Sequence, residues 1–197
     1  MPDATFFFDP ACPWTWRASR WLESVAAARH LEVEWRSASL AVLHEGGDVP
    51  DEYAAPLEAS SRSLRLVEAL RQAGRHDDVG RFYGELGSRT FEADRTIDHD
   101  VVTAAAQAAG LDAQIVSLGD ATLDGAVRAS TETAVAAAGP GVGSPVLVLP
   151  SAERGLHGPI LAAVPDEKDA LALWEAVGTL MEMPAFFELK RGRDGET

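Results

Sequence analysis

The sequence has one cysteine, Cys12, among its 197 residues. A lone cysteine excludes an intramolecular disulfide and any zinc site that needs several cysteines. The five histidines show no His-x-x-x-His pattern and no Cys/His ligand spacing, so no metal site is predicted. Cys12 is therefore either a buried structural residue, which is common for cysteine, or a reactive thiol.

Positive charge is also scarce. Lys and Arg total 17 against 31 for Asp and Glu, which gives a formal net charge of −14. Such a surface repels phosphate backbones and anionic lipid headgroups, so neither nucleic acid nor a membrane is expected as a partner. No basic residue precedes the apolar run Phe6–Phe8, so no secretory signal is predicted and a cytoplasmic, reducing location is expected.

The apolar periodicity divides the chain into three parts. The first part comprises a strand at Thr5–Phe8, a helix at Pro13–Arg29 and a strand at Glu32–Arg36. Helices are then predicted around Leu57–Leu70, Val101–Ala109 and Leu123–Ala137, with glycines as breaks. The last part comprises a strand at Val146–Leu149, a hairpin partner within Gly155–Leu161 and a helix capped by Asp166.

This order is that of an α/β thioredoxin-like domain interrupted by helices. We expect residues 1–45 and 140–197 to form the thioredoxin-like domain and residues 46–139 to form the helical insertion.

Cys12 lies between the first predicted strand and the first helix, and Pro13 takes the first helical position. Free N–H groups at a helix start favour a thiolate, so the pKa of Cys12 is predicted to lie below that of a free thiol. Thr15, three residues later, lies on the same helix face and can donate a hydrogen bond to the sulfur. Asp9, just before this turn, is open to two interpretations, a proton relay to Cys12 or a turn-forming residue before proline.

Ser144-Pro145 opens the third strand. In a thioredoxin-like order, a proline at this position faces the active-site thiol. We therefore expect the Ser144-Pro145 bond to be cis, close to the Cys12 sulfur, and to offer backbone hydrogen bonds to a thiol-bearing ligand.

Several motifs are spread over nearly the whole chain. They are Phe8-Asp9-Pro10-Ala11-Cys12-Pro13-Trp14-Thr15-Trp16, Ser19-Arg20-Trp21-Leu22, Ser39-Leu40, Gly143-Ser144-Pro145, Gly158-Pro159 and Phe186-Phe187-Glu188-Leu189-Lys190. With these motifs the chain resembles the DsbA-like mycothiol-dependent reductases of actinobacteria, a group labelled nitroreductases.

The resemblance implies a thioredoxin-like fold with a helical insertion and a cytosolic thiol-redox role. Mycothiol would be a co-substrate, with no bound cofactor. Cys12 would be the nucleophile, Pro13 and Trp14 would shape its rim, and Ser144 and Pro145 would form the cis-proline site.

Two positions depart from the family pattern. Thr15 stands where family members carry a second cysteine, which removes the resolving thiol. His44 stands where the family carries Asn in the loop after the second strand, a position expected near the ligand, although an exposed loop histidine is an equal alternative.

The function predicted from these observations is that of a monothiol oxidoreductase. It would use a low-molecular-weight thiol to reduce small-molecule or protein disulfides, or nitroaromatic and other electrophilic substrates. Two alternatives stay open: a transferase or isomerase like the kappa-class glutathione transferases, and a non-catalytic protein that binds a thiol ligand. A homodimer is also left open.

Overall fold

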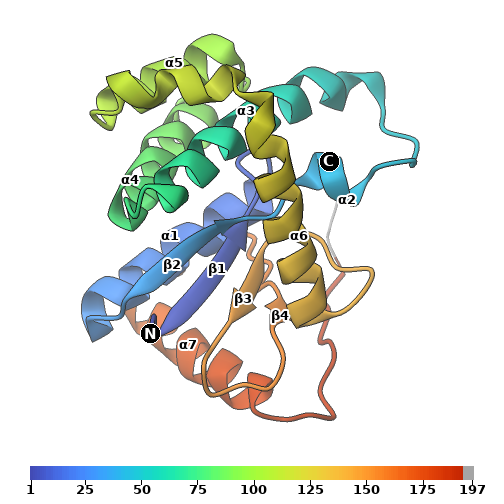
Figure 1. The fold of residues 1–197 in the computed structure, drawn as a ribbon. Helices are drawn as coiled ribbons and strands as arrows, with labels where there is room; N and C mark the ends of the chain where they lie inside the picture. The colour runs from blue at the N-terminus through green and yellow to red at the C-terminus, as the bar shows by residue number, and fades with distance from the viewer. Residues whose placement is uncertain (193–197) are drawn as a thin grey trace.

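A four-stranded mixed sheet forms the centre of the protein (Figure 1). The computed structural model describes residues 1–192. The strands are β1 (Ala4–Phe8), β2 (Val33–Ser37), β3 (Val146–Val148) and β4 (Leu156–His157), in the order β2-β1-β3-β4. β1 runs parallel to β2 and antiparallel to β3, and β3 is antiparallel to β4. The predicted hairpin partner of β3 is therefore confirmed.

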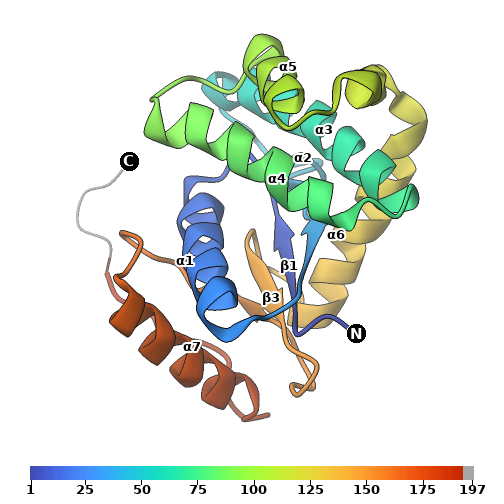
Figure 2. The same ribbon diagram turned by 90° about the vertical axis from the view of Figure 1, so that its left-hand side faces the viewer.

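Helices cover both faces of this sheet. Figure 2 shows α1 (Pro13–Arg29) and α7 (Glu167–Met181) together on one side and α6 (Asp124–Ala138) on the other. The indole N–H of Trp21 donates to the carbonyl oxygen of Ala170 at 3.0 Å, which joins α1 to α7. α6 contacts β2, β3 and β4.

The remaining helical elements lie between β2 and β3 in the chain. They are α2 (Leu40–Leu43), α3 (Asp51–Gln72), α4 (His76–Gly87), the π-helical turn η1 (Ser88–Glu92), α5 (His99–Ala108) and the 3₁₀ segments η2 (Asp112–Gly119) and η3 (Ala121–Leu123). The fold is a thioredoxin-like α/β domain with an inserted helical part, as the sequence predicts. The limits of that insertion at residues 46 and 139 stay a prediction, and residues 193–197 of the predicted thioredoxin-like part lie outside the described residues.

Short-range sequence signals place several helix starts correctly. α1 begins at Pro13, as predicted. The side chain of Asp166 accepts the Asp169 N–H at 2.9 Å, and Asp98 accepts the Val101 N–H at 2.7 Å in the same way. These carboxylates satisfy N–H groups that have no partner inside their helices.

The uncharged stretch from Thr133 to Ala152 forms the end of α6, a loop and the strand β3. No helix within residues 1–192 is both long enough and apolar enough to cross a membrane.

An aromatic cluster connects the inserted helices to the sheet. The Tyr83 ring of α4 stacks on Phe8 of β1 with centroids 4.1 Å apart, and it meets Trp16 of α1 edge-on at 5.7 Å. α4 approaches closely because it carries glycines. A Cβ atom on Gly87 would lie 2.1 Å from the Trp16 ring, and one on Gly80 would lie 2.9 Å from Trp35 Nε1.

We predict that Gly87→Ala destabilises the protein by ~1–3 kcal/mol, because the new methyl group overlaps the Trp16 ring and must displace it. Gly84→Ala in the same helix is the matched control. Its added Cβ meets only the end of the Arg20 side chain at 3.8 Å, so it should be neutral or stabilise by up to ~1 kcal/mol. Urea unfolding followed by tryptophan fluorescence measures both changes. Equal stability of the two variants would contradict the packing role of Gly87.

Candidate active site

Cys12 caps the N-terminus of α1 and is nearly enclosed. Its backbone is extended, and its carbonyl oxygen accepts the Trp16 N–H at 3.1 Å, the first hydrogen bond of the helix. Its own N–H donates to the Asp9 carbonyl oxygen at 3.2 Å, which closes the turn after β1. Only 6% of the residue is exposed.

Ser144 brings the start of β3 against this turn. The Ser144-Pro145 bond is cis, and the Cys12 thiol donates to the Ser144 carbonyl oxygen at 3.5 Å. Both the predicted isomer and the predicted contact are therefore confirmed. The Ser144 hydroxyl also accepts the Asp9 N–H at 2.9 Å and lies 2.9 Å from the Thr15 hydroxyl.

These contacts determine which hydroxyl group donates and which accepts. Because Ser144 Oγ accepts the Asp9 N–H, its hydrogen can be donated to Thr15 Oγ1. The Thr15 hydrogen can then be donated to the Cys12 sulfur. Thr15 is completely buried, so its hydroxyl is held in this position by the protein and not by water.

The prediction of a lowered pKa for Cys12 is wrong. Burial raises the pKa of the Cys12 thiol above its ordinary value, and this effect is larger than the opposing hydrogen bonds from the side chain and backbone of Thr15 and the backbone of Trp14. The helix start therefore stabilises the thiolate as expected, but loss of water around the sulfur outweighs it. The negative charge of Asp9 raises the pKa of Cys12 further.

Asp9 begins this turn, and the residue is 1% exposed. Its Oδ1 accepts the Ala11 N–H at 2.8 Å and the Ser60 hydroxyl at 2.6 Å, and its Oδ2 accepts the Leu40 N–H at 2.7 Å. Burial raises the pKa of Asp9, and these three hydrogen bonds reduce that increase.

Tyr83 is a further polar residue beside Cys12, and it was not predicted from the sequence. Its side chain is fully buried, and its hydroxyl makes no hydrogen bond within the part of the chain that the structure describes. The nearby Ser19 hydroxyl donates instead to the Trp16 carbonyl oxygen at 2.7 Å. Burial raises the pKa of Tyr83 well above its ordinary value, so Tyr83 is a neutral phenol.

The other residues predicted to bind substrate lie further out. Pro13 is exposed, and Trp14 is half-buried with the Arg17 guanidinium 4.9 Å above its ring. His44 is exposed at the end of α2, and its Nδ1 lies 2.8 Å from the Leu40 carbonyl oxygen. A positive charge on the His44 ring would lower the pKa of Asp9.

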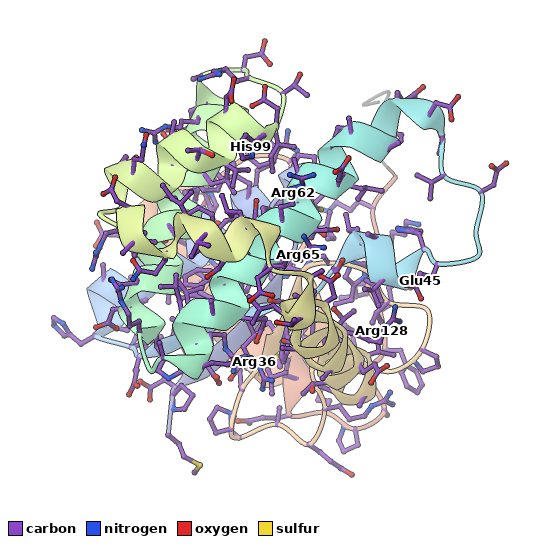
Figure 3. All side chains as sticks on the ribbon, turned by 45° about the horizontal axis from the view of Figure 1, so that its top comes forward. Arg36, Glu45, Arg62, Arg65, His99 and Arg128 are labelled. Atoms are coloured by element: carbon purple, nitrogen blue, oxygen red, sulfur yellow. The ribbon has the colours of Figure 1, made fainter. Side chains whose placement is uncertain are left out.

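A separate cavity of about 320 Å³, lined by charged and apolar residues, lies between α2, α3 and α6, and Cys12 does not line it. Figure 3 shows Glu45, Arg65 and Arg128 around this space. Arg65 forms a two-point ion pair with Asp124 at 2.6 and 2.9 Å, and Arg128 pairs with Glu45. These ion pairs fasten α3 and the end of α2 to α6.

Within the described residues, no three His, Cys, Asp or Glu side chains gather as a metal site would need. The candidate site is built from the Cys12 thiol, the hydroxyl groups of Thr15 and Ser144 and the buried carboxyl group of Asp9, all between the end of β1, the start of α1 and the segment just before β3.

Solved structures share this fold over nearly their whole length. A 2-hydroxychromene-2-carboxylate isomerase matches 90% of this chain and 95% of its own, with a TM-score of 0.61 and 16% identity. A probable DsbA oxidoreductase, SCO1869 from Streptomyces coelicolor, matches 99% of this chain and 98% of its own, with a TM-score of 0.56 and 23% identity. The fold class of this chain is therefore the DsbA-like thioredoxin fold, here with a cysteine at the start of α1 beside a cis-proline.

Within that class, the chain belongs to the Rv2466c-like family, described as mycothiol-dependent nitroreductase Rv2466c, whose model matches residues 11–191. It is therefore a thiol-dependent oxidoreductase. The chain is also 28% identical over 194 residues to the uncharacterized protein Rv2286c of Mycobacterium tuberculosis, and the match covers 97% of this chain and 82% of that protein.

We predict that Cys12 reacts with iodoacetamide with a pH midpoint above the value for a free thiol, about 8.5. Thr15→Val should raise this midpoint by up to about one unit, because it removes one hydrogen bond that stabilises the thiolate. Ser24→Ala is the matched control in α1, since the Ser24 hydroxyl bonds only to the Trp21 carbonyl oxygen of the same helix. A wild-type midpoint below 8.5 would show that burial does not dominate.

Proposed function

We propose that this protein is a monothiol, mycothiol-dependent reductase in which Cys12 is the nucleophile. The observation that carries the proposal is the pairing of Cys12 with Thr15 at the start of α1 beside the cis Ser144-Pro145 bond, in a chain of this family. Since the sequence has no second cysteine, no internal thiol can resolve a disulfide formed at Cys12.

The reaction proceeds by two thiol–disulfide exchanges. In the first, the Cys12 thiolate attacks the mycothiol sulfur of a mixed disulfide, the S–S bond breaks, and the substrate leaves as a thiolate that takes up a proton. In the second, the thiolate of another mycothiol molecule attacks the Cys12 mixed disulfide and releases Cys12 as a thiolate. Mycothiol disulfide is formed, and two electrons pass from mycothiol to the substrate.

The contacts of Cys12 fit both states of the sulfur. The resting thiol donates to the Ser144 carbonyl oxygen, and this contact is lost when the S–H hydrogen leaves. The Thr15 hydroxyl then stabilises the thiolate, both when it attacks and when it is released. The Ser144 carbonyl oxygen, once vacated, can accept an amide N–H from the bound thiol molecule.

We assign Pro13, Trp14 and His44 to the rim where the mycothiol and acceptor bind, because Pro13 and Trp14 directly follow Cys12, His44 acts on the nearby Asp9, and all three are exposed or half-buried. The acceptor is a disulfide of a small thiol or a protein. Nitroaromatic or other electrophilic compounds are a second acceptor class, which the description of the family favours. Mycothiol acts as co-substrate in the cytoplasm, and the reaction needs no bound cofactor.

A thiol transferase or isomerase is the second candidate, and one observation favours it. Burial raises the pKa of Cys12, and a residue that stays protonated can activate a bound thiol by hydrogen bonding without forming a bond to it. Turnover by a Cys12→Ser variant distinguishes the two, since the isomerase would retain activity and the reductase would not. A protein that binds mycothiol without turnover is the outcome if neither activity is found.

Incubation with mycothiol disulfide should add the mass of one mycothiol less two hydrogen atoms to the wild-type protein and none to Cys12→Ser. Intact-mass spectrometry measures this adduct, and excess reduced mycothiol should remove it. If wild-type protein forms no adduct and consumes no mycothiol with disulfide or nitroaromatic acceptors, the proposed reductase function is wrong.

Thr15→Cys should introduce an internal resolving thiol and lower the amount of trapped Cys12–mycothiol adduct at least severalfold. The new thiol lies three residues after Cys12 on the same helix face, and its attack on the adduct would form a disulfide between Cys12 and the introduced thiol and release mycothiol. Thr15→Ser, which keeps the hydroxyl, is the matched control and should accumulate the adduct like the wild type. Equal adduct levels in Thr15→Cys and wild type would show that position 15 does not reach the Cys12 sulfur.

A further inference from the structure

Asp9 connects the Cys12 turn to two other parts of the chain. Its carboxyl group accepts hydrogen bonds from Ala11 in the turn, Leu40 after β2 and Ser60 in α3. Its backbone carbonyl oxygen accepts the Cys12 N–H, and its backbone N–H donates to the Ser144 hydroxyl. One residue thus contacts both Cys12 and the residue whose carbonyl oxygen receives the Cys12 thiol.

The hydrogen-bond donors around Asp9 indicate which protonation state of its carboxyl group the site stabilises. Three donors point at the two oxygens of Asp9, and the hydrogen bonds of the described residues include no acceptor for a carboxylic acid proton at this position. This arrangement stabilises a carboxylate. The carboxylate has no ion pair among the described residues, so its charge acts on the groups around it with little screening.

Three titratable groups face Asp9. Cys12 comes from its own turn, His44 from the end of α2 and Tyr83 from α4. α3 and the β3 segment contribute only the neutral hydroxyl groups of Ser60 and Ser144. A negative charge at Asp9 disfavours a second negative charge on the Cys12 sulfur.

We propose that Asp9 is a positioning residue for Cys12, that its buried charge disfavours the Cys12 thiolate, and that Ser60 of α3 holds this charge in place. The inserted helix α3 therefore takes part in setting the reactivity of the thiol. The inference rests on the proposed role of Cys12 as the reactive group, but it needs no mycothiol for its test.

The test is the pH profile of Cys12 modification by methyl methanethiosulfonate, in which the thiolate attacks the reagent sulfur and methanesulfinate leaves. Below the thiol midpoint the rate should fall tenfold per pH unit. It should fall less steeply across a shoulder where Asp9 takes up a proton, because the neutral carboxyl group no longer opposes the thiolate. This shoulder should lie above pH ~4, the ordinary range of a carboxyl group.

Three variants assign the shoulder. Asp9→Asn should abolish it and, at pH 7, raise the rate about threefold to tenfold, which corresponds to a thiol midpoint lower by about half to one pH unit. Ser60→Ala should move the shoulder to higher pH, because it removes a hydrogen bond that favours the carboxylate. His44→Gln should retain the shoulder, which separates Asp9 from the neighbouring imidazole.

Ser61→Ala is the matched control, since the Ser61 hydroxyl bonds to the Leu57 carbonyl oxygen within α3 and not to Asp9. A purely structural role of Ser60 or Asp9 would lower the unfolding temperature and leave the shoulder unmoved. The proposal is overturned if Asp9→Asn keeps the shoulder or if Ser60→Ala leaves it at the wild-type pH. If Asp9→Asn does not fold, the position of the shoulder in Ser60→Ala tests the proposal by itself.

The outcome is independent of the mycothiol assay. A wild-type protein that forms the mycothiol adduct but shows no shoulder would retain the proposed function and lose the role of Asp9. A protein that shows the shoulder but forms no adduct would retain the role of Asp9 and lose the reductase function.

Discussion

A carboxylate without water must be surrounded by donors, and the donors that surround Asp9 come from parts of the chain that are 31 and 51 residues away. The turn that holds Cys12 therefore depends on the hydrogen bonds from Leu40 and Ser60. Tyr83 and Gly87 of α4 add to this dependence by packing against Phe8 and Trp16 on either side of the same turn. The inserted helices are thus a structural part of the thiol site and not an appendage to the sheet.

Local signals in the sequence were sufficient for much of the fold. Pro13 and Asp166 mark helix starts that the structure confirms, because a cap acts within three residues of its own position. α4 was not predicted, since its glycines weaken a helical pattern. Gly80 and Gly87 make sense only when the tryptophan rings of β2 and α1 are present, and no short-range pattern contains that information.

The candidate site shows the same division. Cys12, Thr15 and the cis Ser144-Pro145 bond were predicted from motifs and their order, whereas the sign of the Cys12 pKa shift was not. The helix start acts on the sulfur as expected, but desolvation depends on which distant segments cover it. The partners of the Asp9 carboxyl group were missed for the same reason. Without them, the sequence does not show how Asp9 acts on the thiol.

Burial of the Cys12 sulfur makes its reactivity sensitive to the size of the reagent. With 6% of Cys12 exposed, only a small part of the residue meets solvent, so reagents of different size should reach the sulfur at different rates. A comparison of a small reagent with a bulky one at a single pH therefore measures how far the segments around the thiol separate. Because the chain has no other cysteine, every thiol signal comes from this one place, and the difference between small and bulky reagents reports the separation of segments at the junction of sheet and helices.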